Sequence, residues 1–326
     1  MKNPLEKITA KLRSDMESVD SVIVDNMQSS VALIPQLAGY LIAAGGKRIR
    51  PLLTLASTAI YDGDMVRAHN LAAVVEFIHS ATLLHDDVVD ESAVRRGQES
   101  APQVFGNAAS VLVGDYLFSR SFQMMVADGS LEILRVLSDA SAIIAQGEVM
   151  QLSTANNLET TLDNYIEVVK AKTAALFAAG CEVGPMIAGE DLDQARAMAG
   201  YGMNLGIAFQ IADDVLDYRS SREAMGKAVG DDFREGKMTA PVIFALQDAS
   251  AEERDFWVRT VGRLDQAGGD LERALEIFEA HECMDKTMAL AKMYADLAKQ
   301  ALEIVPEGEL KDLLAEVADY AVERST

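Results

Sequence analysis

The chain has 326 residues, of which 51 are acidic and 29 are basic, and its formal net charge is −22. This balance argues against nucleic-acid binding and against attachment to anionic membranes, because both need clustered positive charge. With 49% hydrophobic and 25% charged residues, the composition is globular rather than disordered.

The cysteine pattern and the absence of long apolar runs indicate the compartment. Cys181 and Cys283 stand far apart without a CxxC partner, so neither a disulfide framework nor a zinc site is supported. The first residues carry charge in every turn and lack the apolar core of a signal peptide. No stretch approaches the roughly 20 uncharged residues that span a bilayer. We therefore expect a cytoplasmic protein without an integral membrane segment.

The dominant pattern along the chain is helical. Apolar residues recur every three or four positions from the start, at Leu5, Ile8, Leu12, Met16 and Val19. Similar stripes return through most of the sequence, and strand signals are nearly absent. Prolines fall where helices are expected to start or stop, as at Pro51, Pro102, Pro185, Pro241 and Pro306. The sequence thus predicts an all-α fold of ten or more helices.

No linker or repeat interrupts residues 1–240, which favours one domain over two. The stretch 249–270 is more polar and loses its apolar rhythm at the two consecutive glycines, Gly268 and Gly269. We therefore expect a single domain over residues 1–326, with 249–326 as a candidate peripheral layer of helices.

A first acidic cluster lies in the segment 76–90, which is predicted to form one long helix. At 3.6 residues per turn, His79, Asp86 and Asp90 share one face, and Asp87 is turned by ~100° from Asp86. Three carboxylates within about one turn destabilise a helix unless a cation lies between them. The flanking residues are strongly apolar, so the helix is expected to be buried, where uncompensated charge is too costly.

These oxygen-only ligands predict a hard cation such as Mg²⁺, which binds a few carboxylates together with substrate phosphates. The alternative is a solvated acidic face of the helix. A second DDxxD, formed by Asp213, Asp214 and Asp217, again lies in an apolar helical stretch. If the two helices face each other across a cavity, the site would hold several divalent ions and a shared anion such as diphosphate.

Basic residues that suit a diphosphate concentrate in a few segments. Arginine forks match phosphate oxygens, whereas lysine acts as a point charge. The segments are GGKRIRP, with Lys47 and Arg50; RRG, with Arg95 and Arg96; Lys172-Thr173, expected within a helix; and the loop 226–237, with Lys227 and Lys237. The arginine pair is expected at the end of the first acidic helix, where it would also complement the helix dipole. The loop is either a surface connection or a lid over the phosphates.

With these motifs, the sequence resembles the trans-type polyprenyl diphosphate synthases, specifically the long-chain bacterial kind that make quinone side chains. The resemblance extends from Gly45 to Pro241. It is carried in order by GGKRIRP, EFIHSATLLHDDVVDESAVRRG, GDYLFSRSF, GEVMQL, KT, FQIADDVLDY and GKAVGDDFREGKMTAP. One departure is Ala240, where the family often has leucine before the proline; it touches no proposed ligand.

The resemblance implies an all-α isoprenoid-synthase fold around a central cavity, usually as a homodimer, with two or three Mg²⁺ ions per site. It implies that isopentenyl diphosphate is bound by Lys47, Arg50, His79 and Arg96. It implies that the allylic diphosphate is surrounded by Arg95, Lys172, Thr173, Gln210, Lys227 and Lys237. The implied principal metal ligands are Asp86, Asp90 and Asp213, with direct or water-mediated support from Asp87, Asp214 and Asp217.

The implied reaction agrees with these residue types. An allylic diphosphate loses pyrophosphate to form an allyl cation, so catalysis means neutralising charge on the leaving group. The double bond of isopentenyl diphosphate then attacks, and the departing pyrophosphate can accept the proton. The expected catalytic residues are Asp86, Asp90, Asp213, Lys172, Thr173 and Gln210. No nucleophilic triad is needed, and no GxSxG motif is present.

Small residues before Asp86 bear on product length. Ala81 and Thr82 lie five and four positions back, about 6 to 7.5 Å along the helix, where a growing hydrocarbon tail must pass. A bulky aromatic there would plug the tunnel, as short-chain relatives are understood to do. We therefore expect an octaprenyl to decaprenyl product, with a floor farther down at Phe122, Met124 or Met125. The alternatives are close helix packing at these small residues, and a shorter geranylgeranyl or farnesyl product.

Three other functions share features with this sequence but fit it less well. A di-iron site would use Glu76-x-x-His79, but no second ExxH exists. A noncatalytic partner subunit would not need two complete aspartate motifs. A terpene cyclase would share the metal clusters but has no need of GGKRIRP and RRG for a second diphosphate. Separately, Asp115 after Gly114 is expected to cap a helix that begins at Tyr116.

Overall fold

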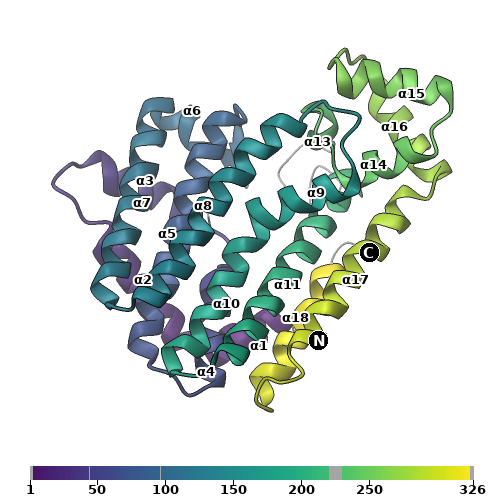
Figure 1. Ribbon diagram of the computed structural model, residues 1–326. Helices are drawn as coiled ribbons and strands as arrows, with labels where there is room; N and C mark the ends of the chain where they lie inside the picture. The colour runs from purple at the N-terminus through teal and green to yellow at the C-terminus, as the bar shows by residue number, and fades with distance from the viewer. Residues whose placement is uncertain (1–2, 44, 96, 220–229, 324–326) are drawn as a thin grey trace.

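The computed structural model describes residues 3–43, 45–95, 97–219 and 230–323. Helices dominate this part of the chain, which confirms the predicted all-α class (Figure 1). The helical elements are α1 (Pro4–Lys11), α2 (Arg13–Asn26), α3 (Leu33–Ala43), α4 (Ile49–Ile60), α5 (Met65–Val89), α6 (Ala101–Phe105), α7 (Asn107–Asp128), α8 (Leu131–Thr154), α9 (Leu162–Val169), η1 (Lys170–Ala174), α10 (Ala175–Ala188), α11 (Leu192–Arg219), α13 (Asp231–Arg234), α14 (Ala240–Gln247), α15 (Ala251–Trp257), η2 (Val258–Gly262), α16 (Asp270–Ala280), α17 (Cys283–Ala301) and α18 (Glu309–Glu323).

Two short strands, β1 (Val94–Arg95) and β2 (Gln98–Glu99), pair antiparallel just after α5. Arg95 was expected just past the first acidic cluster, at the end of its helix; in the structure it lies in a hairpin beyond that helix. Among the described helices, none combines the length and the apolar character that a bilayer crossing requires.

The long helix α5 carries the first acidic cluster, as predicted. Asp64 caps its N-terminus by accepting hydrogen bonds from the backbone N–H groups of Val66 and Arg67, at 2.9 and 3.3 Å. The helix then runs for 25 residues to Val89, and its C-cap is Asp90. Because most of its length is apolar and buried between α4, α7 and α10, the acidic end is held rigidly.

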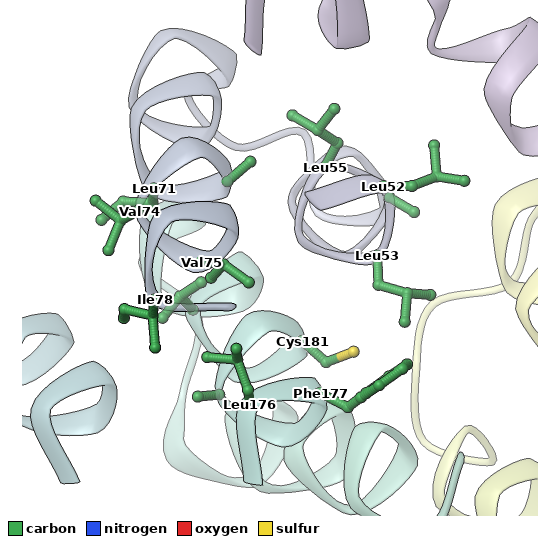
Figure 2. Close-up of a cluster of buried hydrophobic side chains, with 14 of the residues drawn as sticks. Leu52, Leu53, Leu55, Leu71, Val74, Val75, Ile78, Leu176, Phe177 and Cys181 are labelled. Atoms are coloured by element: carbon green, nitrogen blue, oxygen red, sulfur yellow. The ribbon is translucent and has the colours of Figure 1, made fainter. Parts of the chain in front are cut away.

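The core around α5 is formed by aliphatic side chains from three helices. Figure 2 shows Leu52, Leu53 and Leu55 of α4, Leu71, Val74, Val75 and Ile78 of α5, and Leu176, Phe177 and Cys181 of α10. All of these side chains are buried. Burial of this apolar surface stabilises the three-helix arrangement that positions the site.

A second buried cluster lies toward α13–α16, around Trp257. The indole ring stacks on Phe278 with ring centroids 5.6 Å apart. Helix α17 contributes Ala291 to this cluster and Ala298 to the first one. In Figure 1, α15 and α16 lie at one end of the molecule, while α17 runs back along α11 and α18 packs on α1. The single-domain expectation with a peripheral layer stays a prediction.

The glycines of α11 let this helix approach α10 and η1 closely. A Cβ at Gly202 would lie 2.4 Å from the carbonyl oxygen of Phe177, and one at Gly206 would lie 2.7 Å from the Cα of Ala174. Only a residue without a side chain fits such contacts. The approach brings the second acidic cluster, at the C-terminal end of α11, beside η1.

One proline lies differently from the expectation. Pro185 is inside α10 and not at its boundary, although the helix ends within one turn of it, at Ala188. Gly189 adopts the left-handed conformation, with φ at 81°, and closes the helix through backbone hydrogen bonds to the carbonyls of Met186 and Pro185.

Candidate active site

The first acidic cluster is partly neutralised by basic side chains of the protein itself. Asp87 is 1% exposed; its Oδ1 accepts a hydrogen bond from Arg95 Nε at 2.7 Å and forms an ion pair with Arg95 Nη2 at 2.6 Å. From the sequence, a metal ion was expected to compensate the buried carboxylates of this helix. The hairpin after α5 supplies Arg95 as a cation of the protein itself, because it folds back over the helix end.

Asp86 lies beside a second cation, Lys172 of η1. The Lys172 Nζ is 3.7 Å from Asp86 Oδ2 and 2.6 Å from Glu148 Oε2 of α8. Burial, followed by the charge of Asp86, raises the pKa of Glu148 to about 7. Burial also raises the pKa of Asp86, against the lowering effect of Lys172. One ammonium group therefore serves two partly buried carboxylates, so negative charge is in excess here.

Lys172 and Thr173 belong to a short π-helical segment, η1. Such segments insert an extra residue into a helical turn and often occur at functional sites. The neighbouring helix α8 comes close to this segment at Gly147, where a Cβ would lie 2.7 Å from the backbone nitrogen of Lys172. The glycine allows the approach that sets Glu148 against Lys172.

Replacing Gly147 with alanine is expected to lower the free energy of unfolding by about 1–3 kcal/mol, because the new methyl group would overlap backbone atoms. Urea denaturation measures the change. A matched control is Gly200→Ala in α11, where the nearest atom to the new Cβ would be 3.5 Å away, at Ala301. The control should gain up to about 1 kcal/mol from helix propensity. Equal changes in both variants would contradict the close-approach argument.

The second acidic cluster also has one carboxylate held by internal hydrogen bonds. Asp214 is 4% exposed; its Oδ2 accepts from the Tyr165 hydroxyl at 2.5 Å, and its Oδ1 accepts from Gln210 Nε2 at 2.9 Å. The Thr173 hydroxyl donates to Gln210 Oε1 at 2.9 Å. Burial raises the pKa of Asp214 to about 7, although both donors lower it. In each DDxxD, therefore, the second aspartate is engaged inside the protein.

Lys237 lies close to residues of both acidic clusters. Its Nζ lies 3.8 Å from Asp90 Oδ2, 3.9 Å from Asp232 Oδ1 and 2.5 Å from Glu235 Oε2. The backbone N–H of Asp232 donates to Asp217 Oδ2 at 3.1 Å. Burial alone would lower the pKa of Lys237, but Asp232 and Glu235 raise it above its ordinary value. The acidic ends of α5 and α11 thus share one cationic neighbour.

The basic residues of GGKRIRP lie around the start of α4. Arg50 Nη1 is 3.1 Å from His79 Nε2, and its guanidinium lies 4.5 Å from the ring centroid of Phe177. Lys47 Nζ is 5.9 Å from the ring centroid of Tyr320 on α18. The structure therefore places Arg50 and His79 side by side, as one ligand site would need. Arg96 and Lys227 lie outside the described residues.

The residues expected to set product length lie on α5 and α7. Ala81 is 0% exposed, whereas Thr82 is half-buried and donates to the His79 carbonyl at 2.8 Å. Met124 and Met125 of α7 are buried and Phe122 is partly buried, all within the first core cluster.

The expectation for Asp115 is wrong. Helix α7 begins at Asn107, so Asp115 lies in its interior and caps nothing. The glycine before it has a packing role, since a Cβ at Gly114 would lie 2.4 Å from His85 Nε2. His85 itself contacts Asp115 Oδ1 at 3.3 Å. Gly114 therefore makes room for the imidazole ring of His85 and does not mark the start of a helix.

The donor set suits a hard divalent cation. The groups that the two clusters offer are carboxylate oxygens, the ligands that such an ion prefers. Within the described ranges, no three acidic, histidine or cysteine side chains converge on one point. Asp87 and Asp214 are held by Arg95, Tyr165 and Gln210. The remaining carboxylates that would hold Mg²⁺ are Asp86, Asp90, Asp213 and Asp217.

Three residues of this arrangement were given no role from the sequence: Glu148, Asp232 and Tyr165. Glu148 stands in GEVMQL and Asp232 in GKAVGDDFREGKMTAP, segments that carried the resemblance, so a signal was present. Tyr165 lies outside any quoted motif. A tyrosine in an amphipathic helix gives no indication of which acid it will contact.

Comparisons with known proteins find similar polyprenyl diphosphate synthases over nearly the whole chain. Residues 31–278 match the model of the family described as polyprenyl synthetase. The octaprenyl diphosphate synthase of Escherichia coli K12 is 44% identical over 98% of this chain and 99% of its own. A decaprenyl diphosphate synthase structure from Rhodobacter capsulatus has a TM-score of 0.94 and 48% identity, covering 99% of both chains. A polyprenyl synthase from Caulobacter crescentus CB15, complexed with calcium and isoprenyl diphosphate, has a TM-score of 0.96 and 47% identity, covering 100% and 99%.

Proposed function

Because this chain belongs to the polyprenyl synthetase family, we propose that it condenses isopentenyl diphosphate repeatedly with an allylic diphosphate, to an octaprenyl to decaprenyl product. It is a trans-prenyltransferase, and its similarity to octaprenyl and decaprenyl diphosphate synthases supports long-chain synthesis. A quinone side chain is the proposed destination of the product. The geranylgeranyl or farnesyl alternative predicts shorter products in the same assay.

The observation that carries the proposal is the shared environment of the two acidic helix ends. Lys237 stands within 4 Å of Asp90 of the first cluster and of Asp232, which is hydrogen-bonded to Asp217 of the second. Two acidic helix ends on either side of one cation suit a ligand that brings both negative phosphates and divalent ions. The substrate cavity between α5 and α11 stays a prediction.

Mg²⁺, when bound, would neutralise the charge that develops on the departing diphosphate. The protein would hold it through Asp86 and Asp90 of α5 and Asp213 and Asp217 of α11. The calcium in the similar polyprenyl synthase structure supports a divalent ion in this fold. Removal of the metal with a chelator is expected to stop turnover.

The basic side chains have a complementary role. Lys172 and Lys237 carry positive charge into partly buried positions, where electrostatic stabilisation of a leaving group is strongest. Arg50 and His79 are proposed to bind isopentenyl diphosphate, together with Lys47 and Arg96. Arg95, Thr173, Gln210 and Lys227 are proposed to complete the allylic diphosphate site.

The proposed function is tested by incubating the protein with Mg²⁺, labelled isopentenyl diphosphate and, in parallel reactions, geranyl or farnesyl diphosphate, and sizing the hydrolysed alcohols. Long-chain alcohols are the expected products. Products that stop at geranylgeranyl would favour the short-chain alternative. Incorporation with geranyl diphosphate alone would favour a farnesyl product, and no incorporation with either primer, with a folded protein, would favour the noncatalytic partner subunit.

Replacing Ala81 with phenylalanine is expected to shorten the longest product by several isoprene units, because the ring would stand in the path of the growing tail. Ala81 is fully enclosed, so the ring must displace its neighbours. Thr82→Phe, at a half-buried position, provides a second variant with less overpacking. Ala81→Ser is the matched control and should leave the product length unchanged. An unchanged distribution by mass analysis in both phenylalanine variants would remove the tunnel assignment.

The homodimer that the resemblance implies is also a proposal. Helices α7 and α8 expose several large apolar side chains, among them Leu112, Val126, Leu131, Val149 and Leu152. These side chains support an interface that a second copy of the chain would cover.

A further inference from the structure

Tyr165 of α9 ends a chain of hydrogen bonds that runs into the proposed allylic site. The side chain is 5% exposed, and its hydroxyl donates to Asp214 Oδ2 at 2.5 Å. The other oxygen of Asp214 accepts from Gln210, and the carbonyl of Gln210 accepts from Thr173, both at 2.9 Å. Four residues from α9, η1 and α11 are thus linked through their side chains.

The carboxylate sets the direction of every bond in this chain. Asp214 accepts from the hydroxyl of Tyr165 at one oxygen and from the amide nitrogen of Gln210 at the other, so both donors face it. The carbonyl oxygen of Gln210 must then face Thr173, which donates to it. Reversal of the amide would set an oxygen against the carboxylate, so one orientation is selected.

We infer that Tyr165 is a positioning residue for the allylic diphosphate, acting through Asp214 to fix the orientation of Gln210 and Thr173. The inference rests on the proposed function, in which Thr173 and Gln210 line that site. Without the hydroxyl, Asp214 loses the shorter of its two side-chain hydrogen bonds. The carboxylate can then rotate, and the Gln210 amide is no longer held.

The test is Tyr165→Phe, which removes one oxygen and keeps the ring in the second core cluster. The kcat/KM for farnesyl diphosphate is expected to fall about tenfold, the effect of one lost hydrogen bond. The KM for isopentenyl diphosphate should change by less than about twofold, because Arg50 and His79 lie outside the hydrogen-bond chain. A general loss of structure would not separate the two substrates in this way.

Tyr201→Phe is the matched control. Tyr201 is also fully buried, and its hydroxyl donates to the Leu314 carbonyl at 2.8 Å, within the other core cluster. Tyr201→Phe also removes a buried hydroxyl, but at a position far along α11 from Gln210. The control should keep the kcat/KM of the wild type. Equal losses in the two variants would reduce Tyr165 to a stabilising core residue and overturn the inference.

A double-mutant cycle with Thr173→Val tests the route, using the Kd for unreactive farnesyl thiolodiphosphate with Mg²⁺. If Tyr165 acts through Gln210 and Thr173, its replacement should weaken binding about tenfold alone but less than about twofold in the Thr173→Val background. Equal effects in both backgrounds would overturn the inference. A wild type that binds the analogue but transfers no prenyl group would contradict the proposed function, while the same Kd ratios still decide the role of Tyr165.

Discussion

Replacing Asp86 with asparagine should lower kcat by about a thousandfold while leaving the protein folded. The variant loses a negative charge from the face that would hold Mg²⁺, and Lys172 remains paired with Glu148 at 2.6 Å. The leaving diphosphate would then be neutralised less well. The measurement is the rate of label incorporation at saturating substrates.

The thermal stability of the Asp86→Asn variant should not fall with its activity. Burial raises the pKa of Asp86 in the folded state, so the folded protein binds this proton more tightly than the unfolded chain does. The ionised group therefore costs stability above its unfolded pKa, and the cost is absent at lower pH. Asparagine removes that cost, so the thermal midpoint at neutral pH should equal or exceed that of the wild type.

Asp115→Asn is a suitable control for this pair of measurements. Asp115 is an exposed aspartate on α7 that contacts His85, the neighbour of Asp86. Its replacement should change neither turnover nor the thermal midpoint noticeably. An Asp86→Asn enzyme with full activity would contradict the metal assignment, and one with a much lower midpoint would contradict the argument from burial.

Replacing Arg95 with methionine should lower the free energy of unfolding by about 3 kcal/mol or more, because it leaves the buried Asp87 carboxylate without its cation. Urea denaturation measures this loss. Replacing both residues, as Arg95→Met with Asp87→Leu, should recover most of the stability, since an apolar pair can substitute for a buried ion pair.

The same variants separate two roles of Arg95. If it also contacts the allylic diphosphate, activity in the double variant will stay below that of Asp87→Leu alone, which keeps Arg95, although the stability returns. The matched control is Arg67→Met, because Arg67 makes two 2.9 Å hydrogen bonds to the buried Asp128 away from the site. Arg67→Met should lose stability and keep its kcat at a temperature where it is folded. An Arg95→Met protein as stable as the wild type would contradict the importance of the ion pair.

The helical pattern of this protein could be predicted from its sequence because it is local. Apolar residues at a spacing of three and four gave the course of α5 and α11, and both DDxxD runs lie on those helices as expected. The family resemblance added the fold and the activity. The short hairpin around Arg95 was not anticipated, because strands of two residues leave no periodicity to read.

The partners of the charged side chains were decided by the tertiary structure. Arg95 pairs with Asp87, Lys172 with Glu148, and Tyr165 with Asp214, each across a separation in sequence that no local pattern bridges. The buried acidic cluster was correctly expected to need cations, but part of that need is met by the protein's own lysines and arginine. Which cation reaches which carboxylate depends on how closely the helices approach. Glycines such as Gly147 and Gly206 allow that approach because a Cβ at either position would overlap the neighbouring backbone.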